Sequence, residues 1–275
     1  MPAKYPERIV CLTEESTETL YLLGEERRIV GISGYTVRPP RARREKPRVS
    51  AFLSARTEKI VQLKPDLVVG FSDLQADIAR DLAKAGLNVL IFNQRSVQEI
   101  LDMILALASL VGAADRGAAL VGRLEEGLAE IREAAKAFPR KPRVYFEEWD
   151  QPMISAIRWV SELVEIAGGE DVFSEQSRSH AATGRIVASG NLVIEKSPDV
   201  ILGSWCGKKF RPERVAARPG WDAIPAVREN QLFEVKSAEI LQPGPAALTD
   251  GVRRIHEILR RSSGRGAGIR SRAAG

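Results

Sequence analysis

The chain has 275 residues, of which 44% are apolar, and a formal net charge of +5. This length allows two ordinary domains, and this apolar share excludes a generally disordered chain. Much of the positive charge lies in residues 37–48 and 261–275, which lack the signatures of a nucleic-acid reader, so we expect no nucleic-acid partner.

The chain has two cysteines, Cys11 and Cys206, in contexts too different to predict a disulfide framework. It has no run of about 18 apolar residues, so we expect no membrane insertion. Its start lacks a basic segment followed by an apolar one, the pattern of a secretory signal. As written, the sequence predicts a cytoplasmic protein; a misassigned start would make it periplasmic.

The first part of the chain alternates short β-rich runs with amphipathic helices. Strands alternating with helices predict a parallel sheet covered by helices on both faces. The expected elements, in chain order, are strand 8–12, helix 16–24, strand 28–33, helix 56–63, strand 66–71, helix 74–86 and strand 88–93.

One long helix is predicted next, over residues 115–138, because its apolar residues form a single stripe and Pro139 ends it. The α/β pattern then begins again. The expected elements are strand 143–149, helix 161–169, strand 199–205, strand 231–236 and helix 250–261.

The second half repeats the first in the order and type of its elements. "KPDLVVGFS" (64–72) is matched by "SPDVILGSW" (197–205), each a buried strand that ends in glycine. The sequence therefore predicts an α/β protein with two Rossmann-like lobes, joined once by a single long spine helix. We expect the lobes at residues 1–114 and 139–262, the spine at 115–138 and a disordered basic tail at 263–275. Because open α/β sheets bind ligands at the carboxyl ends of their strands, a ligand cleft is expected between the lobes.

Several segments resemble one known family over residues 8 to 260. They are "RIVCLTEESTETLYLLG", "RTEKIVQLKPDLVVGFS", "LAKAGLNVLIFN", the long helix, and "RPGWDAIPAVRENQLFEVKS" followed by "LQPGPAALTDGVRRIHEIL". In their order and spacing, these segments are similar to the helix-spined substrate-binding proteins of ABC importers, which take up vitamin B12, ferric siderophores and haem. "GWDAIPAVRENQLFEV" and the Pro-Gly-Pro near the end resemble the cobalamin-binding branch most.

The resemblance implies a monomeric, non-enzymatic binding protein without a cofactor of its own. Its ligand would be a small molecule, cobalamin or a ferric chelate, taken up for ABC-type import or handled inside the cell. An ABC permease is the second implied partner. Family members dock to a permease pair through one exposed acid on each lobe, and Asp77 and Glu213 match by position. Solvated surface acids are the alternative interpretation of both residues.

Residues that follow the predicted strands are the expected ligand contacts. In the first lobe they are Glu14, Glu15, Ser16, Tyr35, Phe52, Phe71 and Ser72. In the second lobe they are Glu147, Glu148, Trp149, Arg158, Trp159, Trp205, Cys206, Lys208, Lys209 and Arg211.

These residue types suit a large, flat and partly polar ligand. Indole rings bury large apolar areas, and the cations beside them suit carboxylates, phosphate or amide oxygens. For the tryptophans, packing in the core is the alternative, and for the cations it is a solvated loop. The pairs Glu14–Glu15 and Glu147–Glu148 suit a hard metal or a cationic group. Glu14 and Glu15 also suit the positive end of a helix.

A second hypothesis is a metal-handling protein or an enzyme on the same fold, using Cys206 with Glu147, Glu148 or His180. Against it, Cys206 and His180 fit no metal-ligand spacing, and no base or oxyanion donor for a thiolate is placed by the sequence. The sequence therefore assigns neither catalytic residues nor metal ligands. We expect His180 to be exposed and His256 to be structural.

Overall fold

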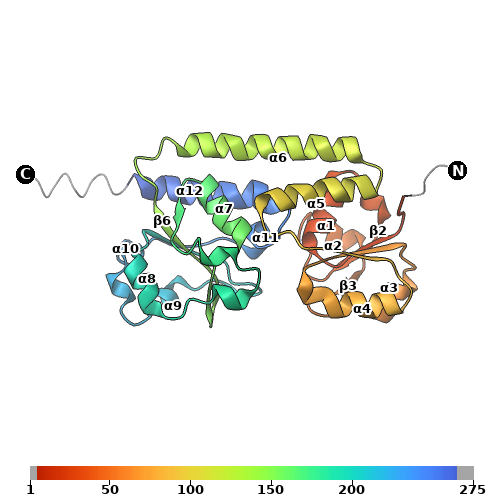
Figure 1. The fold of residues 1–275 in the computed structure, drawn as a ribbon, viewed down its shortest axis with the longest axis horizontal. Helices are drawn as coiled ribbons and strands as arrows, with labels where there is room; N and C mark the ends of the chain where they lie inside the picture. Colours follow the sequence, from red (N-terminus) through yellow and green to blue (C-terminus); the bar gives the residue numbers. More distant parts are fainter. Residues whose placement is uncertain (1–4, 265–275) are drawn as a thin grey trace, which may run out of the picture. The chain divides into compact units, whose positions relative to one another are not determined.

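The computed structural model of the chain describes residues 5–264 and shows an α/β protein (Figure 1). The chain divides into two compact units. Unit 1 consists of the residues up to Gln94 together with Gln98–Glu125 and Gln242–Pro245, and unit 2 of Arg95–Val97, Glu126–Leu241 and the residues from Ala246 onward.

Unit 1 is built on one parallel sheet of five strands in the order β3-β2-β1-β4-β5. The strands are β1 Ile9–Cys11, β2 Ile29–Ser33, β3 Arg48–Ser50, β4 Leu67–Phe71 and β5 Val89–Phe92. The helices are α1 Glu14–Leu22, α2 Ala42–Glu45, α3 Thr57–Gln62, α4 Ala76–Lys84 and α5 Val97–Leu110. Val10, Val68 and Ile60 meet in a core between the sheet and helices α3 and α4.

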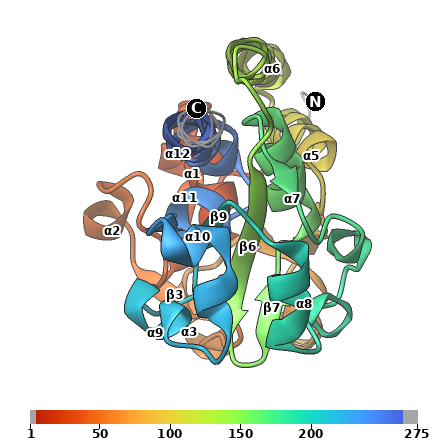
Figure 2. The same cartoon turned by 90° about the vertical axis from the view of Figure 1, so that its left-hand side faces the viewer.

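The sheet of unit 2 has the strand order β10-β9-β6-β7, with β8 also paired to β6. The strands are β6 Arg143–Asp150, β7 Met153–Ser155, β8 Glu170–Asp171, β9 Val200–Gly203 and β10 Leu232–Glu234. Strand β7 folds back antiparallel onto the end of β6, as Figure 2 shows, whereas the other pairs are parallel. The helices are α7 Arg158–Ile166, α8 Gly190–Lys196, α9 Pro212–Ala216, α10 Pro225–Arg228, α11 Ser237–Ile240 and α12 Val252–Ser263.

The predicted long helix is α6, Ala114–Ala135, whose 22 residues span about 33 Å at 1.5 Å per residue. Its residues up to Glu125 belong to unit 1 and those from Glu126 to unit 2. Two short segments, Arg95–Val97 and Gln242–Pro245, group with the other unit than their neighbours in the sequence do. The tail predicted at 263–275 lies largely outside the described residues.

The repeated "KPD" and "SPD" segments form the same structural module in both units. Lys64 and Ser197 end the preceding helix with a left-handed backbone (φ 48° in each), and a proline then stops the helix. Asp66 accepts hydrogen bonds from Glu7 N (2.7 Å) and Arg8 N (3.0 Å) at the start of β1. In unit 2, Asp199 accepts one from Arg143 N (2.8 Å) at the start of β6.

An arginine completes each module by binding the end of that same helix. Arg8 Nη2 donates to Leu63 O (2.6 Å), and Arg143 Nη2 donates to Lys196 O (2.8 Å). These arginines satisfy carbonyls that a helix end leaves without partners. The repetition in the sequence therefore encodes the anchoring of one strand beside another: β4 beside β1, and β9 beside β6.

The glycines that end the two repeated strands are required by packing. A Cβ on Gly70 would lie 2.6 Å from Gln75 Oε1, and one on Gly203 would lie 1.9 Å from Phe210 Cδ2. No side chain fits at either distance, so each glycine allows a neighbouring side chain to close over the strand.

The sequence predicted the α/β class correctly, and strands β1, β2, β4, β5, β6, β9 and β10 are confirmed. It missed the strands β3, β7 and β8 and the helices α2, α5, α8, α9, α10 and α11. Among the described residues, no helix combines the length and the apolar run that crossing a membrane requires.

Candidate functional site

In unit 1, the accessible predicted contacts lie on two adjoining loops that follow β2 and β3. Gly34 N donates to Ser50 O (2.7 Å), which holds the two loops together. Tyr35 is 59% exposed, Phe52 is half-buried, and Leu53, which the sequence analysis did not include, is 68% exposed. This part of unit 1 therefore has an accessible apolar and aromatic surface.

Phe71 and Ser72 lie beneath that surface and are buried. Gln75 ties them to the loop, because its side chain donates to Phe52 O (2.9 Å) and accepts from Phe71 N (3.0 Å). Ser72 has φ 67°, a backbone conformation that favours glycine, and its amide donates to Phe92 O (2.8 Å). Phe71 and Ser72 are therefore buried residues under the loop that carries Phe52.

Glu14, Glu15 and Ser16 begin helix α1 and are also buried, with exposures of 5%, 2% and 1%. Glu14 Oε1 accepts from Val37 N (2.7 Å), Glu15 Oε1 accepts from Thr13 Oγ1, and Glu15 Oε2 has no hydrogen-bond partner. A Cβ on Gly244 would lie 2.4 Å from Glu15 Cβ, so the 242–245 segment packs against the base of this side chain.

Burial raises the pKa of both carboxyls to about 7. Repulsion between Glu14 and Glu15 adds to the effect at Glu14, while the hydrogen bond from Thr13 opposes it at Glu15. The pair is therefore partly protonated near neutral pH, which the sequence analysis did not anticipate.

In unit 2, Glu147 is fully buried and its carboxylate is saturated by hydrogen bonds. Arg218 binds both of its oxygens, Nη1 to Oε2 at 2.6 Å and Nη2 to Oε1 at 3.0 Å. Tyr145 OH donates to Oε2 (2.9 Å) and Trp205 Nε1 donates to Oε1 (3.0 Å). Both oxygens of Glu147 are therefore engaged inside unit 2, so its carboxylate is not exposed as the prediction of a ligand contact supposed.

Trp205 and Trp159, only 2% and 3% exposed, belong to the interior of unit 2. Trp205 packs edge-on against Phe210, with ring centroids 5.0 Å apart, and Trp159 Nε1 donates to Ile240 O (2.9 Å). Both rings are thus packed in the interior, as the alternative interpretation for the tryptophans expected, and Trp205 also has Lys208 Nζ 5.2 Å from the centre of its ring.

Trp149 is the accessible tryptophan among the three predicted contacts. It ends β6, is half-buried, and has Lys208 Nζ 4.0 Å from the centre of its ring. Lys208 follows β9 on an exposed turn and forms an ion pair with Asp150. Cys206, Lys209 and Arg211 are exposed on the same segment. This segment and Trp149 form the accessible part of the predicted site in unit 2.

The remaining predicted contacts are engaged in ion pairs. Arg185, itself 2% exposed, pairs with Glu148 and donates to Ser155 O (2.7 Å). Arg158 is exposed in the first turn of α7 and pairs with Glu162 (2.9 Å).

Three residues that hold the site together were missed: Gln75, Arg185 and Arg218. Arg218 and Glu147 are 71 residues apart, and Arg185 and Glu148 are 37 residues apart. A lone arginine in an irregular segment gives no local pattern. The one available signal was the presence of glutamates inside an otherwise apolar strand, which require buried partners.

The metal-handling hypothesis calls for a cluster of metal-binding side chains. Within residues 5–264, no three His, Cys, Asp or Glu side chains come together as metal ligands would. His180 is exposed in its loop, and His256 is structural: its Nδ1 lies 3.0 Å from Ala167 O and its ring stacks on Phe138.

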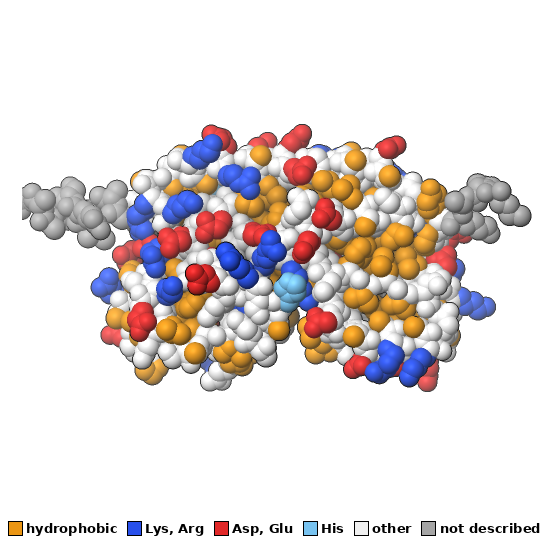
Figure 3. All heavy atoms as spheres, viewed as in Figure 1, with side chains coloured by type: hydrophobic (Ala, Val, Ile, Leu, Met, Phe, Trp, Pro, Cys, Tyr) orange, Lys and Arg blue, Asp and Glu red, His pale blue; other side chains and the backbone are white. Residues whose placement is uncertain are grey.

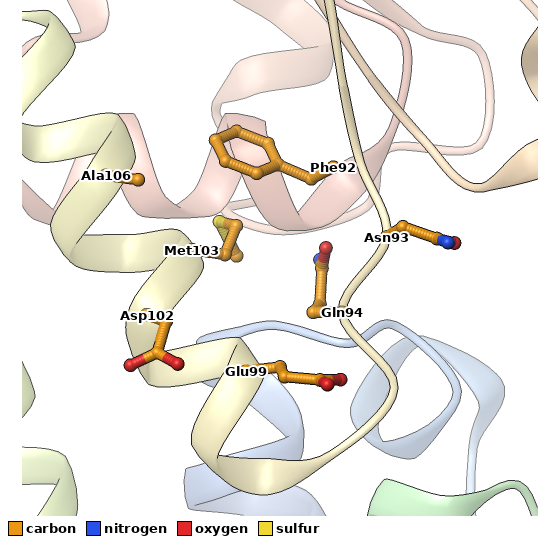
Figure 4. A pocket seen from close by; sticks show the side chains of 7 residues that line it. All are labelled: Phe92, Asn93, Gln94, Glu99, Asp102, Met103 and Ala106. Atoms are coloured by element: carbon orange, nitrogen blue, oxygen red, sulfur yellow. The ribbon is translucent and has the colours of Figure 1, made fainter.

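A separate shallow pocket of about 250 Å³ lies in unit 1 between β5 and α5 (Figure 4). Phe92, Met103 and Ala106 form its apolar part, and Asn93, Gln94, Glu99 and Asp102 complete it. Hydrophobic side chains gather around α5 on this face, whereas charges of both signs are interspersed on unit 2 (Figure 3). The pocket includes none of the predicted contacts and is small for a bulky ligand.

Two α/β units, each with the repeated strand module, are the architecture of the two-lobed substrate-binding proteins. The profile of the periplasmic binding protein family matches residues 9–239. The chain belongs to this family, whose members are non-enzymatic binding proteins.

Relatives and solved structures agree with this assignment. An ABC transporter substrate-binding lipoprotein of Bacillus subtilis is 26% identical over 265 residues, covering 93% of this chain and 81% of its own. A vitamin B12-binding protein of Vibrio cholerae is 26% identical over 264 residues, covering 92% and 89%. The same fold occurs in a possible iron-binding periplasmic protein of Staphylococcus epidermidis, with a TM-score of 0.80, 22% identity and coverage of 93% and 99%. It also occurs in a periplasmic haem-binding protein solved with two haems, with a TM-score of 0.78, 24% identity and coverage of 93% and 98%.

Proposed function

We propose that the protein captures a bulky, partly apolar small molecule for an ABC importer, and that the ligand is a corrinoid such as cobalamin, a haem or a ferric chelate. The observation that carries this proposal is the exposed aromatic surface after the strands of each unit: Tyr35 and Phe52 in unit 1, and Trp149 in unit 2. Relatives that bind vitamin B12 and haem support the ligand class.

We propose different roles for the exposed and the buried residues of the predicted site. Tyr35, Phe52 and Trp149 supply apolar contact, while Lys208, Lys209 and Arg211 serve polar groups at the edge of the ligand. Cys206 lies among these cations as a small exposed contact. The buried members support the loops that carry the contacts: Glu14, Glu15, Ser16, Phe71, Ser72, Glu147, Trp159 and Trp205.

Calorimetric titration with cobalamin, haemin and ferric siderophores tests this proposal, and we expect micromolar or tighter binding of one of them. Calorimetry is preferable to fluorescence because these ligands absorb tryptophan emission. Truncating Tyr35, Phe52 or Trp149 to alanine is expected to weaken binding about tenfold or more, since each removes a large apolar contact.

Leu22→Ala is the matched control, because Leu22 is 50% exposed at the end of α1, away from these loops. It should leave the dissociation constant unchanged. A folded protein that binds none of the three ligand classes would contradict the proposed function.

We propose that Asp77 and Glu213 contact the permease. Asp77 opens α4 with its side chain 85% exposed, and Glu213 lies in the first turn of α9 with its side chain 65% exposed. Their ion pairs, with Arg80 and Arg211, are on the surface and contribute little to stability. Both acids are therefore available to cationic groups of a partner.

Charge reversal of both acids, Asp77→Lys with Glu213→Lys, is expected to reduce ligand-dependent ATPase activity of the reconstituted importer at least tenfold. Ligand affinity should not change. Reversal of Asp81, an exposed neighbour on α4, serves as the control. Full activity of the double variant would rule out this docking surface.

We propose that the protein works outside the cytoplasm, in place of the cytoplasmic location that the sequence alone predicted. Its relatives include a lipoprotein and several periplasmic binding proteins. Mass spectrometry of the N-terminus of the protein from its native cells, with cell fractionation, tests the location.

A further inference from the structure

The ammonium group of Lys208 lies between two indole rings of unit 2. Its Nζ is 4.0 Å from the ring centre of Trp149 and 5.2 Å from that of Trp205. Both distances are within the range of about 6 Å over which a cation is attracted to an aromatic face. Lys208 also forms an ion pair with Asp150, which directly follows Trp149.

The two rings are positioned by groups other than Lys208. Trp149 Nε1 donates to Gln151 O (2.8 Å) within the β6–β7 hairpin. Trp205 is held by Glu147 and by the edge of Phe210. The aromatic part of this arrangement is therefore fixed by the fold of unit 2.

Lys208, by contrast, reaches the rings from an exposed turn. Gly207 has φ +78°, and nothing lies within 4 Å of where its Cβ would be. The Lys208 side chain is 39% exposed and belongs to a long, flexible residue type. It can leave the rings by rotation of its own side chain.

Asp150 completes the environment of a cation. Its side chain is 12% exposed, and although burial alone would raise the pKa of this carboxyl, its hydrogen bond and ion pair with Lys208 lower it below the usual value. Asp150 is therefore ionised at neutral pH. Two aromatic faces and one carboxylate attract an organic cation but do not supply the oxygen ligands that a metal ion requires.

We propose that Trp149, Trp205 and Asp150 form a binding site for an alkylammonium group, and that Lys208 occupies this site until a ligand displaces it. The inference rests on the proposed function in taking Trp149 as part of the ligand surface. Of the ligand classes proposed above, it favours a ferric chelate that carries an exposed alkylammonium group, because cobalamin and haem carry no such group.

The tethered lysine also makes the site selective. A group attached to the chain competes at a high effective concentration, of the order of millimolar or more. A simple free amine therefore binds poorly to the wild-type protein. A larger ligand displaces Lys208 because its other contacts contribute to the same binding event.

The test removes the tethered cation and supplies a free one. Tetramethylammonium is titrated into the wild-type protein, Lys208→Ala and Lys196→Ala, with tryptophan fluorescence as the readout. Lys208→Ala is expected to bind the probe at least tenfold more tightly than the wild type. Lys196→Ala, which removes an exposed lysine of α8 beside the start of β6, should behave as the wild type does.

Second substitutions identify the site. Adding Trp149→Ala to Lys208→Ala should abolish the gain in affinity for tetramethylammonium, and adding Asp150→Asn should reduce that gain. A Lys208→Ala protein that binds tetramethylammonium no more tightly than Lys196→Ala overturns the inference. Because the probe is neither a corrinoid, a haem nor a chelate, this result is independent of the ligand titrations that test the proposed function.

Nuclear magnetic resonance of the wild-type protein gives a second measurement without a variant at the lysine. The Lys208 methylene protons next to Nζ should be shifted upfield by the two rings. Trp149→Ala should return most of that shift. Methylene shifts at ordinary lysine values in the folded wild-type protein would also overturn the inference.

Discussion

Replacing Arg218 with alanine is expected to lower the free energy of unfolding of unit 2 by about 3–5 kcal/mol, because the variant leaves Glu147 as a buried carboxylate without its counter-ion. Glu147 is 0% exposed, and Arg218 binds both of its oxygens. The guanidinium also lies 4.6 Å from the ring centre of Trp221, so its removal loses packing as well as charge.

The reverse substitution, Glu147→Gln, should be milder, at about 1–3 kcal/mol. The Arg218 side chain is 19% exposed, so water reaches the cation that remains. Glutamine also keeps an oxygen that accepts from Tyr145 or Trp205. The difference between the two variants measures how much of the effect comes from an unpaired buried charge.

Tryptophan fluorescence during urea unfolding reports this effect selectively. All four tryptophans, Trp149, Trp159, Trp205 and Trp221, lie in unit 2. Arg214→Ala is the matched control, since Arg214 is exposed in α9 and its loss should change stability by less than about 0.5 kcal/mol. A loss below about 1 kcal/mol in Arg218→Ala would show that Glu147 does not depend on this partner.

The strands were predictable because their signal is local. "DLVVGF" and "DVILGSW" are short apolar runs bounded by a proline and a glycine. This pattern is typical of a buried parallel strand. Helix α5 also carried a readable signal, the stripe of Ile100, Ile104 and Leu107, to which the sequence analysis gave no element. Helix α5 was therefore predictable from its sequence.

The accessibility of the candidate contacts was less predictable. A residue that follows a strand is near the ligand-binding edge of a sheet, but its exposure depends on distant segments. Glu15 packs against the segment around Gly244, and Trp205 packs against Phe210 and is bonded to Glu147. Tyr35 is 59% exposed, whereas Trp149 is half-buried and has the Lys208 side chain over its ring. Sequence position gave the right edge of each sheet, and packing decided which side chains reach its surface.

Unit 1 is expected to lose stability as the pH rises from about 4.5 to above 7, because Glu14 and Glu15 must ionise while buried. Their pKa values are raised from 4.5 to about 7 in the folded protein. Between these values the folded state binds more protons than the unfolded state, so the free energy of unfolding falls with rising pH. A shift from 4.5 to 7 is 2.5 units, and at 1.36 kcal/mol per unit it corresponds to about 3 kcal/mol for each carboxyl.

Glu15→Gln is expected to remove about half of this pH dependence. Glutamine keeps an oxygen for the hydrogen bond from Thr13 and carries no charge, so the variant should be more stable than the wild type at pH 8 and close to it at pH 5. Glu58→Gln, on the exposed face of α3, is the control and should leave the pH profile of the wild type unchanged.

Unit 1 contains no tryptophan, so its unfolding is followed by far-UV circular dichroism. In that analysis, the unfolding midpoint of unit 2 is set to the value that tryptophan fluorescence gives. If the wild-type unit 1 were equally stable at pH 5 and pH 8, the two carboxyls would not be buried as acids. The other outcome is that the free energy of unfolding of unit 1 falls with rising pH and that Glu15→Gln reduces this fall. The first turn of α1 is then stabilised by the protonated forms of Glu14 and Glu15. Its stability would then differ between acidic and neutral surroundings, and so would the support it gives to the neighbouring ligand surface.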